Sequence, residues 1–309
     1  MTDNYRLTGA ATGLPPWLAL CILTLVAAGC GGFADDDGAP TVFVSVPPQA
    51  YLAERIAGDH ARVRVLLPPG ANHETYSPRP SEIRGLSRAA LYVRTGLPFE
   101  EAAWSHIQET NPGMKIIDGR EGVELRYMSA GEAHNHGHDH GHNHGAGAPD
   151  PHIWLAPENM MAQARQIRDA LRELMPERAV EFETNANSLL AELEALDNEL
   201  AETLAPCEGE TFWVYHPAWG YFADAYGLKQ QAVEQEGKEP GVHSVSQLVQ
   251  QARADGVRRI FVEKQYSTAR VEVIADEIGA EVIALDPLAQ DYPDNLRHVA
   301  GLIREALTP

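Results

Sequence analysis

The sequence predicts an α/β protein with two similar lobes, each holding a mainly parallel sheet, joined by a long backbone helix. Three observations support this fold class. Two separate series of short apolar, β-branched runs occur in the chain, helix-like segments follow several of these runs, and two long helical repeats lie between the two series. Strands that alternate with helices along a chain usually form a parallel sheet covered by helices. Each series therefore predicts one lobe.

The predicted strands fall into two groups of four. The first group comprises Thr41 to Val46, Ala61 to Leu67, Ala89 to Val93 and Lys115 to Ile117, and the second comprises Thr211 to Tyr215, Leu228 to Val233, Arg259 to Glu263 and Glu281 to Leu285. In the second group, helical stretches around Leu248 and Ile274 end at Gly256 and Gly279. We therefore expect an N-terminal lobe over residues 40–176 and a C-terminal lobe over 206–309.

Two strongly helical segments separate the groups. The first has Pro157 in its first turn and an apolar stripe formed by Met160, Ala164, Ile167, Leu171 and Leu174. The second carries the stripe Phe182, Ala186, Leu189, Leu193, Leu196, Leu200 and Leu204. At 1.5 Å per residue, a helix of about 28 residues is about 42 Å long. Residues 177–205 could therefore link the lobes rigidly, although a plain core helix or a coiled coil has the same pattern.

The N-terminus has the features of an export signal. Residues 7–34 carry no charge, and the apolar run from Trp17 to Ala28 is too short for a membrane span. The run leads into Leu25-Val26-Ala27-Ala28-Gly29-Cys30, which resembles a bacterial lipobox. We expect residues 1–29 to be a signal peptide and residues 30–39 a linker that starts at a lipidated Cys30. The alternative is an ordinary cleaved signal with Cys30 merely nearby.

Composition excludes some classes of partner. Lys and Arg number 24 and Asp and Glu 44, which gives a net charge of −20. Such a balance repels nucleic acid and anionic lipid and mildly favours cations. Removal of 29 residues from 309 leaves 280, which is enough for two lobes with cores of their own.

Histidine is concentrated in residues 131–149, which are also rich in Gly, Asn and Asp. Of 13 histidines in the chain, six fall here: His134, His136, His138, His140, His142 and His144. A segment of this composition cannot build a core, so we expect a mobile, exposed loop. Alternating imidazoles offer many interchangeable ligand sets and predict weak accessory binding of several metals. A leftover affinity tag is the alternative, but tags are usually terminal and uninterrupted.

Four further residues predict a more selective site. His73 comes after the second predicted strand, His216 directly follows Thr211 to Tyr215, Asp286 directly follows Glu281 to Leu285, and His152 precedes the first long helix. Ligands in open α/β sheets bind beyond the carboxyl ends of strands. Three imidazoles and one carboxylate suit four-coordinate Zn²⁺.

At these residues the chain resembles a known family, the metal-binding lipoproteins of bacterial ABC importers, in the branch that serves high-affinity zinc uptake. The resemblance rests on five blocks in order: Gly70 to Pro80 around His73, Asp150-Pro151-His152-Ile153-Trp154-Leu155, His216-Pro217-Ala218-Trp219-Gly220-Tyr221-Phe222, Phe261-Val262-Glu263-Lys264-Gln265, and Leu285-Asp286-Pro287-Leu288. It implies a metal buried in the cleft between two α/β lobes.

The resemblance also implies particular roles and partners. Its first three ligands fall on His73, His152 and His216, and its acidic fourth position falls on Asp286. Glu263 is an alternative fourth ligand, or a carboxylate that orients a ligand. The implied protein is a monomer outside the cytoplasm, lipid-anchored to a membrane, that hands Zn²⁺ to an ABC permease with its ATPase and catalyses no reaction.

Other functions stay open at this stage. Manganese-binding relatives tend to have a carboxylate where this chain has His216, which favours zinc. In a zinc hydrolase, Glu263 or Glu74 would act as general base. The metalloprotease helix motif is absent after His73, however, and no Gly-x-Ser-x-Gly or P-loop sequence occurs. A surface adhesin or zinc store would share the binding chemistry and differ only in its client.

Overall fold

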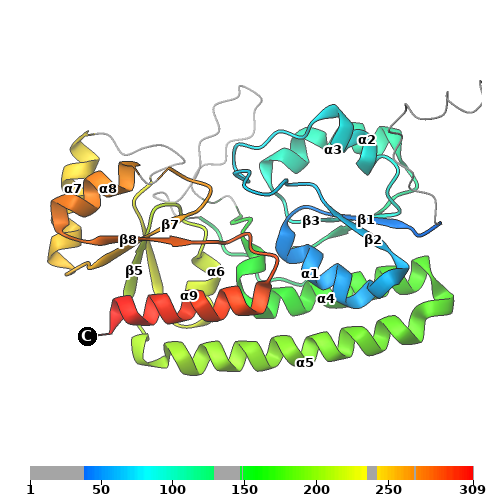
Figure 1. Cartoon of the computed structure of the whole chain (residues 1–309). Helices are drawn as coiled ribbons and strands as arrows, with labels where there is room; N and C mark the ends of the chain where they lie inside the picture. The colour runs from blue at the N-terminus through cyan, green and yellow to red at the C-terminus, as the bar shows by residue number, and fades with distance from the viewer. Residues whose placement is uncertain (1–37, 129–146, 148, 235–241, 268, 309) are drawn as a thin grey trace, which may run out of the picture. The chain divides into compact units, whose positions relative to one another are not determined.

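Two four-stranded parallel sheets organise the chain (Figure 1). The computed structural model describes residues 38–128, 147, 149–234, 242–267 and 269–308. The strands are β1 (Thr41–Val44), β2 (Arg62–Val65), β3 (Leu91–Arg94), β4 (Lys115–Asp118), β5 (Thr211–Val214), β6 (Lys229–Ala232), β7 (Arg259–Glu263) and β8 (Glu281–Leu285). All eight lie within or overlap the predicted runs.

The two sheets share one topology. Their strand orders are β2-β1-β3-β4 and β6-β5-β7-β8, and every strand pair is parallel. The predicted fold of two similar α/β lobes is therefore confirmed. In each sheet the order reverses between the first and third strands, and open α/β sheets bind ligands at such a reversal, beyond the carboxyl ends of the strands. We call β1 to α4 the N-terminal lobe and β5 to α9 the C-terminal lobe.

The position of each strand follows from its residues. All four residues of the central strand β3 are buried, because helices cover both faces of the sheet. The strands β2 and β6 each lie at an edge of their sheet. Polar and apolar side chains alternate in β2, which reads Arg-Val-Arg-Val, and β6 is mainly polar, reading Lys-Gln-Gln-Ala. Polar side chains on an edge strand oppose pairing with another chain.

Nine α-helices occur in the described residues. They are α1 (Pro47–Ala57), α2 (Pro80–Leu86), α3 (Pro98–Thr110), α4 (Pro157–Leu174), α5 (Ala179–Leu204), α6 (Gly220–Ala225), α7 (Val242–Ala254), α8 (Ala269–Ile278) and α9 (Tyr292–Leu307). The first four begin at a proline, whose fixed φ suits the first helical position and whose missing N–H is not needed there.

Helix α5 spans both lobes. Its predicted apolar stripe is buried, with every member at most 1% exposed. The helix packs against α1 and α4 of the N-terminal lobe and against α9 of the C-terminal lobe, and in Figure 1 it runs below both sheets. Its 26 residues correspond to about 39 Å. Because the stripe is buried by helices of the same chain, the linking-helix prediction holds and the coiled-coil alternative does not.

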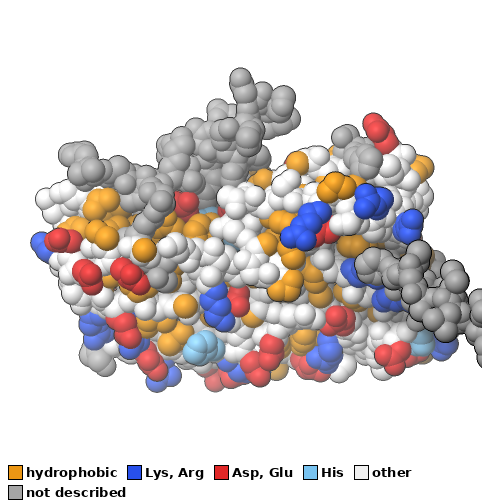
Figure 2. All heavy atoms as spheres, turned by 45° about the horizontal axis from the view of Figure 1, so that its top comes forward, with side chains coloured by type: hydrophobic (Ala, Val, Ile, Leu, Met, Phe, Trp, Pro, Cys, Tyr) orange, Lys and Arg blue, Asp and Glu red, His pale blue; other side chains and the backbone are white. Residues whose placement is uncertain are grey.

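Ion pairs line the exposed side of this helix. Arg55 of α1 pairs with Glu192 at 2.6 Å, and Arg297 of α9 pairs with Glu199 at 2.9 Å. Acidic and basic side chains are interspersed along the lower edge of the face drawn in Figure 2. Exposed pairs of this kind contribute roughly 0–1 kcal/mol each. The buried stripe, and not the surface charges, therefore holds α5 in place.

Three sequence predictions lie outside the described residues. They are the signal peptide over 1–29, the lipidation of Cys30, and the six histidines from His134 to His144. Among the residues that the structure describes, no helix is both long and apolar enough to cross a membrane.

Candidate metal centre

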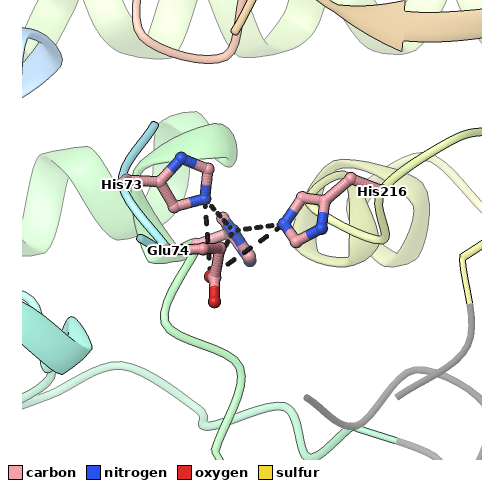
Figure 3. Close-up of side chains that lie close together, drawn as sticks. His73, Glu74 and His216 are labelled. Atoms are coloured by element: carbon pink, nitrogen blue, oxygen red, sulfur yellow. Dashed lines mark hydrogen bonds and ion pairs between the residues drawn. The ribbon is translucent and has the colours of Figure 1, made fainter. Parts of the chain in front are cut away.

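Four potential ligand atoms converge in the interior. His73, Glu74, His152 and His216 each offer one, and all four atoms lie within 4.8 Å of one another. The three histidines are fully buried, and Glu74 is 8% exposed. In Figure 3 the His73 and His216 rings point toward each other from opposite sides, with the Glu74 carboxylate beside them. His73, Glu74 and His152 belong to the N-terminal lobe and His216 to the C-terminal lobe.

The spacing of these four atoms fits tetrahedral coordination of a metal ion. The Nε2 atom of His152 lies 2.8 Å from Nε2 of His73 and 3.4 Å from Nε2 of His216. Oε1 of Glu74 is 3.6, 3.9 and 4.0 Å from the three Nε2 atoms. With zinc–ligand distances of about 2.0–2.2 Å, a tetrahedral sphere separates its ligand atoms by roughly 3.4 Å. The observed distances bracket this value.

A tight turn places His73 and Glu74 side by side. Oδ1 of Asn72 accepts the backbone N–H of Glu74 at 2.8 Å and that of Thr75 at 3.3 Å. Such side-chain acceptance by Asn stabilises a local turn. The turn follows β2, so both side chains project at the carboxyl end of the N-terminal sheet. The predicted placement of His73 beyond a strand is observed.

Asp150 fixes the His152 ring. Its Oδ1 accepts both the backbone N–H of His152, at 3.0 Å, and the ring Nδ1–H, at 2.7 Å. This contact assigns the proton of the neutral ring to Nδ1 and directs the lone pair of Nε2 into the cluster. The Asp150 side chain is fully buried. Carboxylate partners of this kind are typical of metal-binding histidines.

In the C-terminal lobe, a carboxylate orients the His216 ring in a similar way. His216 lies just beyond β5, and its Nδ1–H donates to Oε2 of Glu234 at 2.8 Å. Glu234 itself follows β6. The ring of Tyr266 stacks on that of His216, with centroids 5.1 Å apart and planes at 23°. The ring orientation is therefore fixed by a carboxylate on one side and an aromatic face on the other.

The cluster is strongly acidic around His216. Burial alone would lower the pKa of His216, but the carboxylates of Glu263, Glu234 and Glu74 outweigh it and raise the pKa to about 9. Burial raises the pKa of Glu263 to about 8; the charge of His216 opposes this shift, and Glu234, Glu74 and Asp286 add to it. The site therefore holds protons at neutral pH that a cation would displace.

The two acidic residues predicted as fourth ligands, Asp286 and Glu263, are not members of this four-residue cluster. The sequence predicts Asp286 as the fourth ligand, whereas its Oδ1 accepts the Leu288 N–H at 3.0 Å and its Oδ2 lies 3.4 Å from Nζ of Lys264. It does not belong to the four-residue cluster, because the turn after β8 uses its carboxylate. Glu263 is 2% exposed, and neither of its carboxylate oxygens has a hydrogen-bond partner among the described residues.

The residues predicted from the sequence as metal ligands do not include Glu74, which the structure places in the cluster. From the sequence, Glu74 was a candidate only for the general base of a zinc hydrolase. The signal that could have identified it is adjacency: in a tight turn, neighbouring side chains can reach one ion. The carboxylates that orient the rings, Asp150 and Glu234, were missed as well, since each is recognisable only from its contact with a histidine.

A family comparison accords with this geometry. Residues 42–306 match the model of a family described as ZnuA, the periplasmic component A of the zinc-uptake complex. The chain belongs to this family. The match covers nearly all the described residues, and the resemblance inferred from the five sequence blocks is confirmed.

The names of two curated relatives also refer to zinc uptake or zinc binding. The high-affinity zinc uptake system protein ZnuA of Bacillus subtilis is 30% identical over 278 residues, covering 88% of this chain and 86% of the relative. The zinc-binding lipoprotein AdcA of Streptococcus pneumoniae is 28% identical over 283 residues, covering 87% of this chain but 54% of the relative. The chain thus spans about half the length of AdcA.

Solved structures share the architecture. A crystal structure of ZnuA superposes with a TM-score of 0.78 at 40% identity, covering 87% of this chain and all of that one. A zinc-bound deletion mutant of ZnuA gives a TM-score of 0.77 at 40% identity, covering 88% and 99%. The periplasmic zinc-binding protein TroA of Treponema pallidum, at 19% identity and a TM-score of 0.74, covers 88% of this chain and all of that one and shows the fold alone.

Proposed function

We propose that this chain is an extracytoplasmic solute-binding protein that captures Zn²⁺ between its lobes. The observation that carries the proposal is the convergence of three imidazole nitrogens and one carboxylate oxygen, drawn from both lobes, at tetrahedral spacing. Residues His73, His152, His216 and Glu74 are the proposed ligands. The family match and the zinc-bound ZnuA mutant support zinc as the cargo.

The donor set favours zinc over manganese. Imidazole nitrogen suits zinc, whereas manganese prefers carboxylate, carbonyl and water oxygens in an octahedral arrangement. Three of the four proposed donors here are nitrogens. A four-coordinate site of this composition is typical of Zn²⁺.

Metal competition tests the proposal. We expect the metal-free protein, dialysed against equal concentrations of Zn²⁺ and Mn²⁺, to retain one tightly held Zn²⁺ and little Mn²⁺, because the donors are mainly imidazoles. Elemental analysis of the dialysed protein measures the outcome, with the dialysis buffer as the blank. Preferential retention of Mn²⁺ would contradict the zinc assignment.

The same geometry supports binding without catalysis. A catalytic zinc site keeps a coordination position open for water, but four protein ligands fill a tetrahedral sphere. A zinc hydrolase would also need a general base beside that water. Glu74, one of the candidate bases, is one of the four proposed ligands. We therefore propose that the chain releases the ion unchanged.

Location and partners complete the proposal. The lipobox-like sequence at Cys30 supports a lipid anchor outside the cytoplasm, and the family supports delivery of the ion to an ABC permease with its ATPase. We propose that the chain acts as a monomer. The histidines between His134 and His144 would collect Zn²⁺ weakly near the site and not form the tight site.

The identity of the fourth ligand is open to a direct test. We expect Glu74→Gln to weaken zinc binding more than tenfold, or about 1.4 kcal/mol, because an amide oxygen is a poorer donor than a carboxylate. Asp286→Asn should change the affinity by less than about threefold, a difference below about 0.7 kcal/mol. Competition with a chelator of known affinity measures both. A large loss in Asp286→Asn or Glu263→Gln, with Glu74→Gln unaffected, would transfer the role to that carboxylate.

A further inference from the structure

Arg126 joins the two lobes without belonging to the ligand set. Its Nη1 donates to Oδ2 of Asp150 at 3.1 Å, and its Nε lies 3.2 Å from Oδ2 of Asp224. Asp150 belongs to the N-terminal lobe, whereas Asp224 is on α6 of the C-terminal lobe. One guanidinium therefore bridges carboxylates of both lobes.

Backbone contacts reinforce this bridge. The hydroxyl oxygen of Tyr221, on α6, accepts the backbone N–H of Arg126 at 3.0 Å, and the same hydroxyl donates to the carbonyl of Asp150 at 3.2 Å. The backbone N–H of Asp150 donates in turn to the carbonyl of Arg126 at 2.9 Å. Arg126, Asp150 and Tyr221 thus form a closed set of contacts across the boundary between the lobes.

Asp150 connects Arg126 to the proposed ligand His152. Its Oδ1 holds the His152 ring and Oδ2 accepts Arg126, so the two oxygens face different partners. Its side chain is fully buried, and a buried carboxylate that loses its cation is strongly destabilised. The His152 ring is therefore oriented by a carboxylate whose cation also contacts the C-terminal lobe.

Gly220 leaves room for the guanidinium. A Cβ atom on this residue would lie 2.5 to 2.6 Å from Cζ, Nε and Nη1 of Arg126, closer than real Cβ contacts come. Because those atoms end a flexible side chain, an alanine here would displace the guanidinium and need not disturb α6. The fit between Gly220 and Arg126 offers a second way to disturb the bridge, with no change of charge.

We propose that Arg126 is a positioning residue that, through Asp150, keeps His152 in its metal-binding orientation only while the C-terminal lobe is in contact. This inference rests on the proposed zinc-binding function. It links ion release to lobe separation: loss of the Asp224 and Tyr221 contacts would remove two of the contacts that position Arg126, and would thereby loosen Asp150 and weaken one of the four proposed ligands.

Three variants of the full chain test the proposal. We expect Arg126→Met to weaken zinc binding about tenfold and to speed zinc release into a chelator, within the 10–100-fold range typical of residues that support metal ligands. Gly220→Ala should act in the same direction. Arg168→Met is the matched control, because the Arg168 side chain is 17% exposed against 19% for Arg126 and also contacts two acidic residues, Asp169 and Glu183.

Two readouts separate positioning from general stability. The visible spectrum of Co²⁺ bound in place of zinc should shift in Arg126→Met and not in Arg168→Met, since it reports ligand geometry. In a double-mutant cycle with Asp150→Asn, the effect of Arg126→Met should largely disappear, because both act through one contact.

Different negative results would contradict different parts of the proposal. Equal zinc affinity, release rate and Co²⁺ spectrum in Arg126→Met and Arg168→Met would overturn the inference while leaving zinc capture intact. Full additivity with Asp150→Asn would do the same. A wild-type chain that retains no zinc would overturn the proposed function and, with it, the inference.

Discussion

Replacement of His216 by alanine should reduce zinc affinity more than a hundredfold. The expected loss exceeds the 10–100-fold typical of residues that only support metal ligands, because His216 is itself a proposed ligand and is the only one from the C-terminal lobe. Its removal leaves three donors, all on the N-terminal lobe, and the ion would no longer join the lobes. Isothermal titration, with a competing chelator for the wild type, measures the change.

A surface histidine provides the control. His60 is 25% exposed and pairs with Glu181 at 2.9 Å, away from the cluster, so His60→Ala should leave zinc affinity unchanged. Circular dichroism of each metal-free variant establishes that the fold survives, since His216→Ala also leaves Glu234 without its imidazole partner. Wild-type affinity in a folded His216→Ala variant would remove the proposed site.

Zinc affinity should also fall steeply with acid. The apoprotein carries a proton on His216, whose pKa is raised to about 9, and one on Glu263, whose pKa is raised to about 8. Zinc must displace at least the His216 proton, because Nε2 has to be neutral to ligate. For each proton that zinc must displace, zinc affinity falls about tenfold when the pH drops by one unit. We therefore expect the affinity to fall at least a hundredfold between pH 8 and pH 6.

Proton release can be measured separately. Titrations in buffers of different ionisation enthalpy at pH 7 should show at least one proton released for each zinc bound. The His216→Ala variant is the matched comparison and should release fewer. An affinity that does not change between pH 8 and pH 6 would contradict the protonated state assigned to the apoprotein.

The stability of the apoprotein should change in the opposite direction. The raised pKa of His216 contributes stability that is present below its unfolded value of about 6.5 and is lost as the pH rises toward 9. Glu263 adds a cost that grows as the pH rises from about 4.5 toward 8, because its burial penalises the charged form. The metal-free protein should therefore melt at a higher temperature at pH 6 than at pH 8.5, while the increase produced by zinc should be larger at pH 8.5.

The fold could be predicted from the sequence because its strands and helices produce local patterns of apolar residues. The strands β3 and β7 each contain three consecutive apolar residues, Leu91 to Val93 and Ile260 to Val262, and the stripe from Phe182 to Leu204 repeats at helical spacing along α5. Burial on both faces of a sheet and along one face of a helix produces these patterns directly. Strand ends shifted by a few residues, since hydrogen bonding and not hydrophobicity ends a strand.

The candidate site was only partly readable. Three histidines could be placed because His216 directly follows a recognisable strand, His73 lies in the loop after another, and His152 precedes a recognisable helix. Asp286 has the same sequence context, but the nearby N–H of Leu288 and the amine of Lys264 engage its carboxylate. The choice between Asp286 and Glu74 depends on the turn that Asn72 stabilises. Such a turn is a property of the folded backbone and leaves no periodic pattern in the sequence.

The separation of the ligands along the chain links zinc to the lifetime of the protein. His152 is 79 residues from His73 and 64 from His216, so an unfolded chain would have to close two long loops to gather them. Zinc therefore binds the folded chain far better than the unfolded one and adds about 4 kcal/mol of stability when it is present at a thousand times its Kd. Proteases act mainly on unfolded chains, so scarcity of the metal should shorten the protein's survival, and its abundance would then record the zinc supply around the cell.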